Sequence, residues 1–458
     1  MSKKPFKSVH LTNYYHKSSG GISNSFNRLL EAANRHERFV RLIVPGAADE
    51  VEEIGEYGRI YYVKADFSPV FDKRYRILLP WKTYLQGETP IRKILLAEMP
   101  DMIEISEKYS LSLLAGIIRM GYFKQLNRPM LVHFSCERMD DNVRSFLSDS
   151  RPAMWFARRV MGNYNFPMFD FHVGNSQYTA QELLDSVLPE TNPHRSKTFF
   201  NFCWRYFRAA RIPIQERVFV NPRGVNSVLY SDARKTVENR QALLTEAAIP
   251  ADTKVLLYAG RISPEKNVQL LPDIMGLLAK DKNRDFRLLI AGDGPKKEEL
   301  QQQLEQTASG KFKFLGHVTD KEKLANLYAN ADVFVHPNPR EPFGIAPLEA
   351  MASATPVVAP NAGGILTYAS DENCWLVKPN GAEFAAAIQE IFANETQTKT
   401  KVINALETAR KYTWEISTDR LFALYDEMYE DFERRNELYN YKTEPKEINF
   451  VRELLTEN

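Results

Sequence analysis

The sequence of 458 residues has few cysteines and no long apolar run. Its 3 cysteines, Cys136, Cys203 and Cys374, are far apart and odd in number, which excludes a disulfide framework and favours a reducing compartment. The apolar stretch 111–118 is too short to cross a bilayer, and the basic N-terminus meets polar residues before any signal-peptide core. We therefore expect a cytoplasmic protein without a membrane-spanning helix.

The sequence also lacks an excess of charge of one sign and any metal-ligand pattern. Its 60 basic and 58 acidic side chains give a formal net charge of +2, which provides no general case for nucleic-acid binding. The 8 histidines show no ligand spacing, and no Asp-x-Asp triplet is present to bridge a divalent ion to a diphosphate. We expect no nucleic-acid partner, no metal and no cofactor.

Apolar residues are abundant, at 44%, and they fall into an alternating pattern of short strands and amphipathic helices. This alternation predicts α/β domains with parallel sheets, whose ligands bind at the carboxyl ends of the strands. Strands are expected near residues 8–12, 38–44, 102–105, 130–134, 171–175 and 218–220, and again from 255, 286, 312, 332, 356 and 374. We expect two doubly wound domains facing a cleft, 1–240 and 241–411, followed by a crossover helix and tail, 412–458.

The stretch 338–352, NPREPFGIAPLEAMA, carries two carboxylates at a predicted strand-loop-helix turn. Glu341 lies in the loop, and Glu349 lies inside a helix that should begin near Gly344. The free N–H groups at a helix start suit a diphosphate, while carboxylates accept hydrogen bonds from pairs of sugar hydroxyls. Two solvated glutamates flanking an ordinary turn are the alternative.

A second stretch, GRISPEKN at 260–267, also follows a predicted strand directly. Arg261 and Lys266 would neutralise a diphosphate at this edge and stabilise the charge that grows on it as it leaves. A solvated loop with two surface cations is the alternative. The expected convergence with Glu341 and Glu349 on one sheet edge favours the functional interpretation.

These motifs resemble those of glycosyltransferase family 4, a family of retaining, nucleotide-sugar-dependent enzymes with the GT-B fold. The resemblance rests on 260–267, on the AGDGP at 291–295, on the Glu341-to-Glu349 motif, and on 316–318, 331–333 and 362–364. It is specific across 255–377 and weaker over the rest. The resemblance implies two Rossmann-like domains, with the C-terminal helix crossing back to the first.

The resemblance also implies a role for each residue of the motifs. Arg261 and Lys266 would contact the donor diphosphate and act in catalysis with Glu341, which would hold a hydroxyl of the donor sugar. Glu349 would hold the ribose hydroxyls. The remaining donor contacts would come from Gly20, Gly21, His317, Val318, Phe343, Gly344 and Ile345.

The N-terminal half departs from the family pattern at its catalytic strand ends. Family members often carry a histidine where this chain has Ser106, and Glu107 follows it. His133 and Glu137, with Arg138, follow or end the next strand and could enter the cleft instead. The catalytic group of this domain therefore stays open, with Glu107 and His133 as the first candidates. Retaining enzymes of this kind need no protein nucleophile if the leaving phosphate takes the acceptor proton.

The segment 194–212, HRSKTFFNFCWRYFRAARI, interleaves basic and aromatic residues without an acidic one. Such a segment could lie on an anionic membrane surface, and basic-aromatic interleaving also suits single-stranded nucleic acid. A helix that packs its aromatics on the core and exposes its arginines is the alternative.

The sequence thus predicts a retaining, metal-independent hexosyltransferase that uses a UDP-sugar or GDP-mannose. Its partners would be that nucleotide-sugar donor and a glycan or lipid-linked acceptor, with membrane contact through 194–212 at the inner face. A sugar-nucleotide epimerase or phosphorylase of the same fold is one alternative, and a non-catalytic glycan- or nucleotide-binding subunit is another. Donor hydrolysis without acceptor separates the enzyme from the binding subunit.

Overall fold

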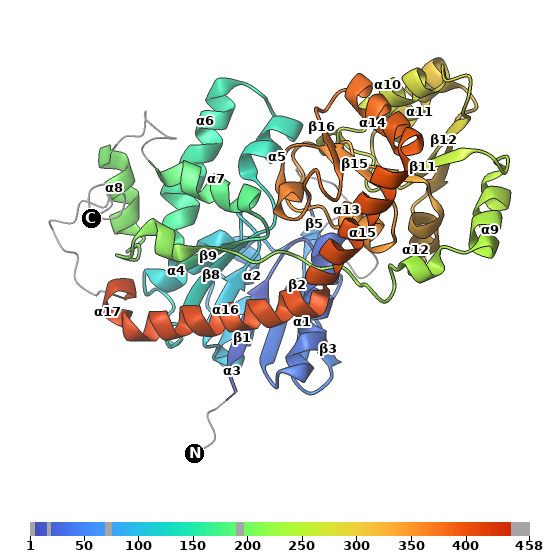
Figure 1. The fold of residues 1–458 in the computed structure, drawn as a ribbon. Helices are drawn as coiled ribbons and strands as arrows, with labels where there is room; N and C mark the ends of the chain where they lie inside the picture. Colours follow the sequence, from blue (N-terminus) through green and yellow to red (C-terminus); the bar gives the residue numbers. More distant parts are fainter. Residues whose placement is uncertain (1–4, 16–19, 69–75, 189–196, 441–458) are drawn as a thin grey trace. The chain divides into compact units, whose positions relative to one another are not determined.

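A computed structural model describes residues 5–15, 20–68, 76–188 and 197–440. The chain forms two compact units, one made of Met1–Asn221 with Thr418–Asn458 and the other of Pro222–Ser417 (Figure 1). The units therefore meet in sequence near 221 and 417, whereas the boundaries expected from the sequence are 240 and 411. Each unit is built on its own parallel sheet, which confirms the predicted α/β architecture.

The sheet of the first unit has eight strands in the order β10-β9-β8-β7-β1-β2-β4-β3. Neighbouring strands are parallel except β3, which pairs antiparallel with β4 at the sheet edge. The bounds are β1 (Lys7–Leu11), β2 (Phe39–Gly46), β3 (Glu50–Ile54), β4 (Gly58–Lys64), β7 (Met102–Ile105), β8 (Met130–Ser135), β9 (Phe171–Gly174) and β10 (Val218–Val220). A two-stranded antiparallel sheet joins β5 (Asp66–Phe67) to β6 (Arg76–Ile77).

Helices cover both faces of this sheet. On one face α1 (Gly21–Arg35) and α16 (Trp414–Arg434) share a buried cluster with β2, β7, β8 and β9. On the other, α3 (Pro90–Glu98) and α4 (Ser112–Arg119) pack on β1, β2 and β7. The remaining helices are α2 (Pro80–Thr83), α5 (Met139–Phe146), α6 (Arg151–Val160), α7 (Gln177–Val187), α8 (Lys197–Tyr206) and α17 (Asn436–Tyr439).

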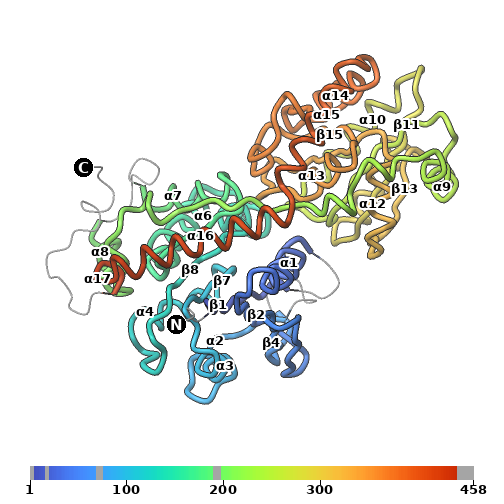
Figure 2. Tube along the Cα trace, turned by 60° about the horizontal axis from the view of Figure 1, so that its bottom comes forward, coloured from blue at the N-terminus to red at the C-terminus, as the bar shows by residue number. Residues whose placement is uncertain are grey.

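Helix α16 confirms the predicted crossover, since it carries the chain from the second unit into the first (Figure 2). Its apolar stripe places Phe422, Tyr425 and Met428 in the core of the first unit. The Tyr425 hydroxyl donates to Glu104 of β7, whose other oxygen lies 3.0 Å from Nδ1 of His10. A buried polar chain therefore fastens the C-terminal helix to the N-terminal sheet.

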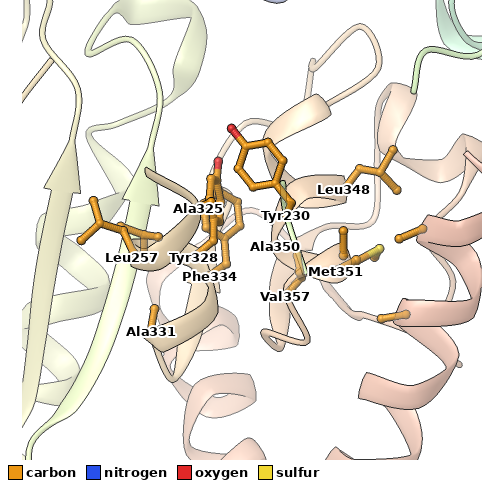
Figure 3. Packing of buried hydrophobic residues seen from close by; sticks show 14 of the residues in the cluster. Tyr230, Leu257, Ala325, Tyr328, Ala331, Phe334, Leu348, Ala350, Met351 and Val357 are labelled. Carbon is orange, nitrogen blue, oxygen red and sulfur yellow. The ribbon is translucent and has the colours of Figure 1, made fainter. Parts of the chain in front are cut away.

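The sheet of the second unit is wholly parallel, in the order β13-β12-β11-β14-β15-β16. Its strands are β11 (Lys254–Ala259), β12 (Phe286–Ala291), β13 (Phe312–Gly316), β14 (Val333–Val335), β15 (Val357–Pro360) and β16 (Trp375–Val377). One face carries α9 (Val237–Ala247), α12 (Lys321–Asn330), α13 (Ile345–Ala352) and α15 (Glu395–Lys411), and part of this core is drawn in Figure 3. The other carries α10 (Leu270–Leu278), α11 (Lys297–Ala308) and α14 (Gly381–Ala393).

Candidate active site

Two sequence motifs meet at the carboxyl edge of the second sheet. The loop 260–267 follows β11 and the loop 336–344 follows β14, and these strands are neighbours in the sheet. Asn267 takes a left-handed conformation and donates from Nδ2 to the carbonyl of Pro337 at 2.9 Å. Parallel topology thus brings together residues that lie about 75 positions apart in sequence, as Lys266 and Glu341 do.

Lys266 and Glu341 form an ion pair at this edge. The Lys266 ammonium donates to both carboxylate oxygens of Glu341, at 2.7 and 3.0 Å. Asn338 donates to the same carboxylate at 3.0 Å, and Nε2 of His336 lies 3.8 Å from it. The Glu341 side chain is 12% exposed and that of Lys266 is 29% exposed, so the pair is reachable but largely shielded from water.

The surroundings fix the charge states of these groups. Burial alone would raise the pKa of Glu341, but Lys266 and His336 outweigh it and lower that pKa to about 2. Burial lowers the pKa of His336 to about 4, with Lys266 acting in the same direction and Glu341 against it. At neutral pH the site therefore contains an anionic Glu341 beside a neutral imidazole. His336 and Asn338 carry no signal in the sequence that would single them out.

Glu349 has the opposite electrostatic character. It lies on α13, and the hydroxyls of Tyr230 and Tyr328 hydrogen-bond its carboxylate. Burial raises the pKa of Glu349 to about 7, although both tyrosine hydrogen bonds act to lower it. Figure 3 shows the two tyrosines side by side among the buried residues beside α13, with their hydroxyls directed to the same side. Sequence reasoning missed both tyrosines because they lie outside the motif.

Three glycines let these loops approach one another. A Cβ on Gly292 would come within 1.9 Å of the Gly260 carbonyl, and one on Gly294 within 2.2 Å of the Ile262 carbonyl. A Cβ on Gly364 would come within 1.9 Å of the Pro342 carbonyl. The AGDGP and AGG sequences therefore have a steric role, because they hold the lysine loop and the glutamate loop in place.

The remaining donor-site candidates lie at strand ends or helix starts. Gly344 has a φ of 88° and precedes α13, and its carbonyl accepts from the Tyr368 hydroxyl. Phe343 is buried, Ile345 and Arg261 are partly exposed, and the Arg261 carbonyl accepts from the Tyr258 hydroxyl at 2.7 Å. His317 and Val318 follow the edge strand β13, where His317 is exposed.

Gly20 and Gly21 lie in the first unit, where they start α1 and are exposed. Gly20 has a φ of 107°, which only glycine adopts readily, and its carbonyl accepts from Asn24 N–H at 3.1 Å. Ser19, which precedes them in the motif, falls outside the described residues. Their contact with a donor stays a prediction.

His133 is buried on the central strand β8, and Glu107 is buried in the loop after β7. His133 is fully buried, its Nδ1 lies 3.2 Å from Nδ1 of His172, and burial lowers its pKa well below the usual value. Glu107 accepts from the N–H groups of three residues before α4, and burial raises its pKa to about 7 against those bonds. These contacts give each side chain a structural role, and a catalytic role for either stays a prediction.

Glu137 and Arg138 follow β8, and both are partly exposed. The Arg138 guanidinium pairs with Asp140, at 2.7 Å, and lies over the ring of Tyr178. The Tyr14 hydroxyl donates to Glu137 at 2.9 Å. Arg138 is thus held in an ion pair. Glu137 instead contacts Tyr14, whose side chain is also partly exposed.

The basic-aromatic segment 194–212 contains helix α8, and its residues 194–196 fall outside the described residues. Some aromatic side chains of this helix are buried and others are exposed, so each interpretation of the segment holds in part. Phe200 and Trp204 are buried, and the Trp204 indole donates to the Gly162 carbonyl at 2.9 Å. The opposite face exposes Phe199, Phe202 and Tyr206 by 52%, 62% and 53%. The aromatics therefore divide between a core face and a surface face.

In the described part of the chain, no group of three or more His, Cys, Asp or Glu side chains is arranged to hold a metal ion. Within the same described ranges, no helix combines the length and apolarity needed to cross a membrane.

Residues 239–408 match the family described as Glycosyl transferases group 1. The chain is 28% identical to the GDP-mannose-dependent alpha-(1-6)-phosphatidylinositol dimannoside mannosyltransferase of Mycobacterium tuberculosis, over 91% of this chain and 94% of that protein. It is 26% identical to the GDP-mannose-dependent alpha-mannosyltransferase of Corynebacterium glutamicum, over 92% of this chain and 89% of that protein. Among solved structures, sucrose-phosphate synthase from Thermosynechococcus elongatus shares the fold, with a TM-score of 0.65 and 20% identity over 93% of this chain and 100% of that one.

The motif residues of the second unit, the family match around them and the similarity over both units agree with one another. The chain is an enzyme with the GT-B fold, and its residues 239–408 are similar to the group 1 glycosyl transferases.

Proposed function

We propose that the enzyme transfers a mannosyl unit from GDP-mannose to a hydroxyl of a glycolipid or glycan, with retention of the anomeric configuration. The observation that carries this proposal is the Lys266–Glu341 pair, held at the carboxyl edge of the second sheet on the motif that ends at Glu349. The choice of donor follows the two relatives that align over nine-tenths of the chain, both of which are named as GDP-mannose-dependent.

The site offers a separate group for each part of such a donor. Lys266 and Arg261 would contact the diphosphate, Glu341 would accept from a hydroxyl of the sugar, and Glu349 would accept from the ribose hydroxyls. In the reaction the bond between the sugar C1 and the phosphate oxygen breaks and a bond from C1 to the acceptor oxygen forms. The acceptor proton passes to the leaving diphosphate, whose growing charge the two cations stabilise.

We further propose that no divalent metal is required. The Arg261 and Lys266 cations and the N-terminus of α13, equivalent to roughly half a charge, would face the leaving group. These charges are fixed in a partly shielded site, where they act more strongly than in bulk water. The support is therefore the presence of protein cations at the position where the charge develops.

Helix α8 supports a third proposal, that the enzyme works at the cytoplasmic face of an anionic membrane. Its exposed aromatics, Phe199, Phe202 and Tyr206, lie in a row along one face, with ring centroids 6.5 and 6.2 Å apart. Lys197 is exposed at the start of the helix and Arg208 two residues beyond its end, and the segment 197–212 contains no acidic residue. Rings at the interface and cations on headgroups are the pattern of a peripheral membrane helix. A lipid-linked acceptor, which the name of the mycobacterial relative includes, would make such contact useful.

Donor titration and steady-state kinetics test the central proposal. Calorimetry should show tighter binding of GDP-mannose than of UDP-glucose to the wild type. Lys266→Ala should lower turnover by about 10²–10³, by analogy with loss of an oxyanion donor, and should weaken donor binding much less. Lys282→Ala, which changes an exposed lysine of the same unit, serves as the control. Equal binding of both donors, or unchanged turnover of Lys266→Ala, would contradict the proposal.

A further inference from the structure

The carboxyl edge of the first sheet carries a second polar site that the donor motifs do not include. Tyr14 follows β1, Glu107 follows β7 and Glu137 follows β8, and these three strands are consecutive in the sheet. Ligands of open α/β sheets bind at this edge. The side chains at these three strand ends are therefore the first place to look for substrate contacts in this unit.

The three side chains differ in how many of their oxygens already form hydrogen bonds within the protein. Glu107 uses both carboxylate oxygens to accept from the N–H groups of Tyr109, Ser110 and Leu111. Glu137 uses only Oε1, which accepts from Tyr14 at 2.9 Å, and its Oε2 accepts from no residue in the part of the chain that the structure describes. Both Glu137 and Tyr14 are partly exposed. Glu137 is thus the carboxylate at this edge with an oxygen left for a ligand hydroxyl.

The backbone around Glu137 is held by a buried ion pair. Lys108, 1% exposed, lies 2.5 Å from the Glu182 carboxylate, 2% exposed, and also donates to the Glu137 carbonyl. Glu182 accepts from the N–H groups of Met139 and Asp140, at 2.5 and 3.2 Å. The Glu137 carbonyl and the start of α5 directly after it are therefore fixed by charged groups from the loop after β7 and from α7. Such support places a ligand-binding side chain in advance of binding.

Tyr14 acts as a fixed donor to Glu137. Burial, with the Glu137 and Glu107 charges, raises the pKa of Tyr14 well above its usual value, so its hydroxyl stays protonated at neutral pH. The bond orients the Glu137 carboxylate and leaves Oε2 to accept from an incoming O–H group. A carboxylate that presents one oxygen in this way suits a sugar or inositol hydroxyl.

We propose that Glu137, held by Tyr14, binds a hydroxyl of the acceptor and positions it for glycosylation. This inference rests on the proposed transferase function. Glu137 accepts a hydrogen bond and does not change in the reaction, since the acceptor proton leaves with the diphosphate. Tyr14 is a positioning residue, because it acts through Glu137.

The test separates acceptor binding from donor use. Transfer from GDP-mannose is measured to methyl α-mannoside and to a phosphatidylinositol mannoside in vesicles, together with slow donor hydrolysis by water. Glu137→Gln should raise the acceptor KM by on the order of tenfold to a hundredfold, the cost of a hydrogen bond to a charged group. Tyr14→Phe should raise it less, and the double variant no more than Glu137→Gln alone. Donor KM and donor hydrolysis should stay within about twofold of wild type.

A matched pair elsewhere in the same unit provides the control. Glu52 accepts from the Tyr62 hydroxyl at 2.8 Å on the antiparallel edge strand β3, away from the carboxyl edge of the parallel strands. Glu52→Gln should leave the acceptor KM unchanged. An unchanged acceptor KM in Glu137→Gln, or equal rises in acceptor and donor KM, would overturn the inference.

Measurements on the wild-type enzyme distinguish a failure of the acceptor inference from a failure of the proposed function. Donor hydrolysis without transfer to either probe would overturn the acceptor-hydroxyl site while leaving donor use intact. A wild type that neither binds nor hydrolyses GDP-mannose would overturn the proposed function itself, and the acceptor inference with it.

Discussion

Glu341 and Glu349 are carboxylates of one short motif, yet their surroundings move their pKa values in opposite directions. Lys266 and His336 offset the burial of Glu341 and lower its pKa to about 2, whereas Glu349 is buried against two tyrosines and its pKa rises to about 7. At the scale of single residues, the motif therefore contains one carboxylate that is always ionised near neutral pH and one that titrates there.

Donor binding should strengthen as the pH rises from about 6 to 8. If the ribose hydroxyls need an ionised Glu349, its competent fraction rises from about a tenth to nine-tenths, which predicts a roughly tenfold fall in the apparent Kd of GDP-mannose. GDP-mannose is the ligand to use because its diphosphate does not titrate in this range. Calorimetry on Glu349→Gln should give weaker binding without the pH trend, and a flat wild-type profile would contradict the assignment.

The stability of the ligand-free protein should also depend on pH through the ionisation of the same two carboxylates. A raised folded-state pKa means that Glu349 stabilises the fold below about pH 4.5 relative to higher pH, and that this contribution is lost as the pH rises towards 7. Glu349→Gln should therefore raise the Tm relative to wild type at pH 8 and change it little at pH 5.

Glu341→Gln should behave in the opposite way. Its lowered pKa contributes stability above the unfolded value near 4.5, which disappears only as the pH falls towards 2. Replacement leaves the Lys266 ammonium without its anion, so the Tm should fall at both pH 5 and pH 8. Scanning calorimetry of both variants checks the pair, and shifts of the same sign at pH 8 would contradict it.

The sequence motifs predicted much of this site but not its charge states. Lys266, Glu341 and Glu349 could be singled out because they are charged residues in the loop or helix that directly follows a predicted strand. Tyr230 and Tyr328 could not, since only the folded core places them against Glu349. His133 looked available in the sequence because burial at a strand end is not visible there, whereas in the structure it is fully enclosed.

At the scale of elements, the loops after β11, β12, β14 and β15 support one another through close backbone contacts. Gly292→Ala would place a methyl group on the Gly260 carbonyl and push the loop that carries Lys266 away from its position. We expect a loss of about 1–3 kcal/mol in unfolding free energy from overpacking, with reduced donor affinity. Gly87→Ala, at a position with no neighbour within 4 Å of the added carbon, is the control. Wild-type donor affinity in Gly292→Ala would show that the loops are independent.

Helix α8 should bind anionic vesicles through its exposed face. Phe202→Ser combined with Tyr206→Ser should reduce cosedimentation with phosphatidylglycerol vesicles at least about tenfold, because both rings would leave the interface. Trp81→Ser, which removes another half-exposed aromatic of the same unit, should leave binding unchanged. Wild-type binding should weaken with salt, since the headgroup attraction is electrostatic. Equal binding to neutral and anionic vesicles would contradict the proposed surface.

Most strands were predictable because parallel core strands read as short apolar runs bounded by turns. The exceptions were β3 and β4, next to one another at the edge of the first sheet, and the two-residue strands β5 and β6. The β3 sequence EVEEI is largely solvent-facing, so it lacks the apolar signal, and its antiparallel pairing depends on the fold.

At the scale of the whole molecule, the two units carry different candidate functional residues. The second holds the donor motifs, and the first holds Glu137 and helix α8. The predicted crossover of the C-terminal helix could be recognised because its apolar stripe lies beyond the last strand of the second sheet. The contact between Tyr14 and Glu137 could not be predicted, since these residues lie 123 positions apart and only the order of strands in the sheet brings them together.

We propose retaining mannosyl transfer that depends on protein cations rather than on a metal. It is tested most directly by following, with proton NMR, the product formed from GDP-α-mannose and methyl α-mannoside or a phosphatidylinositol mannoside in the presence of EDTA. We expect an α-linked mannosyl product that accumulates at a rate little changed by chelator. A β-linked product, or transfer that stops with EDTA and resumes only when a divalent metal is returned, would contradict it.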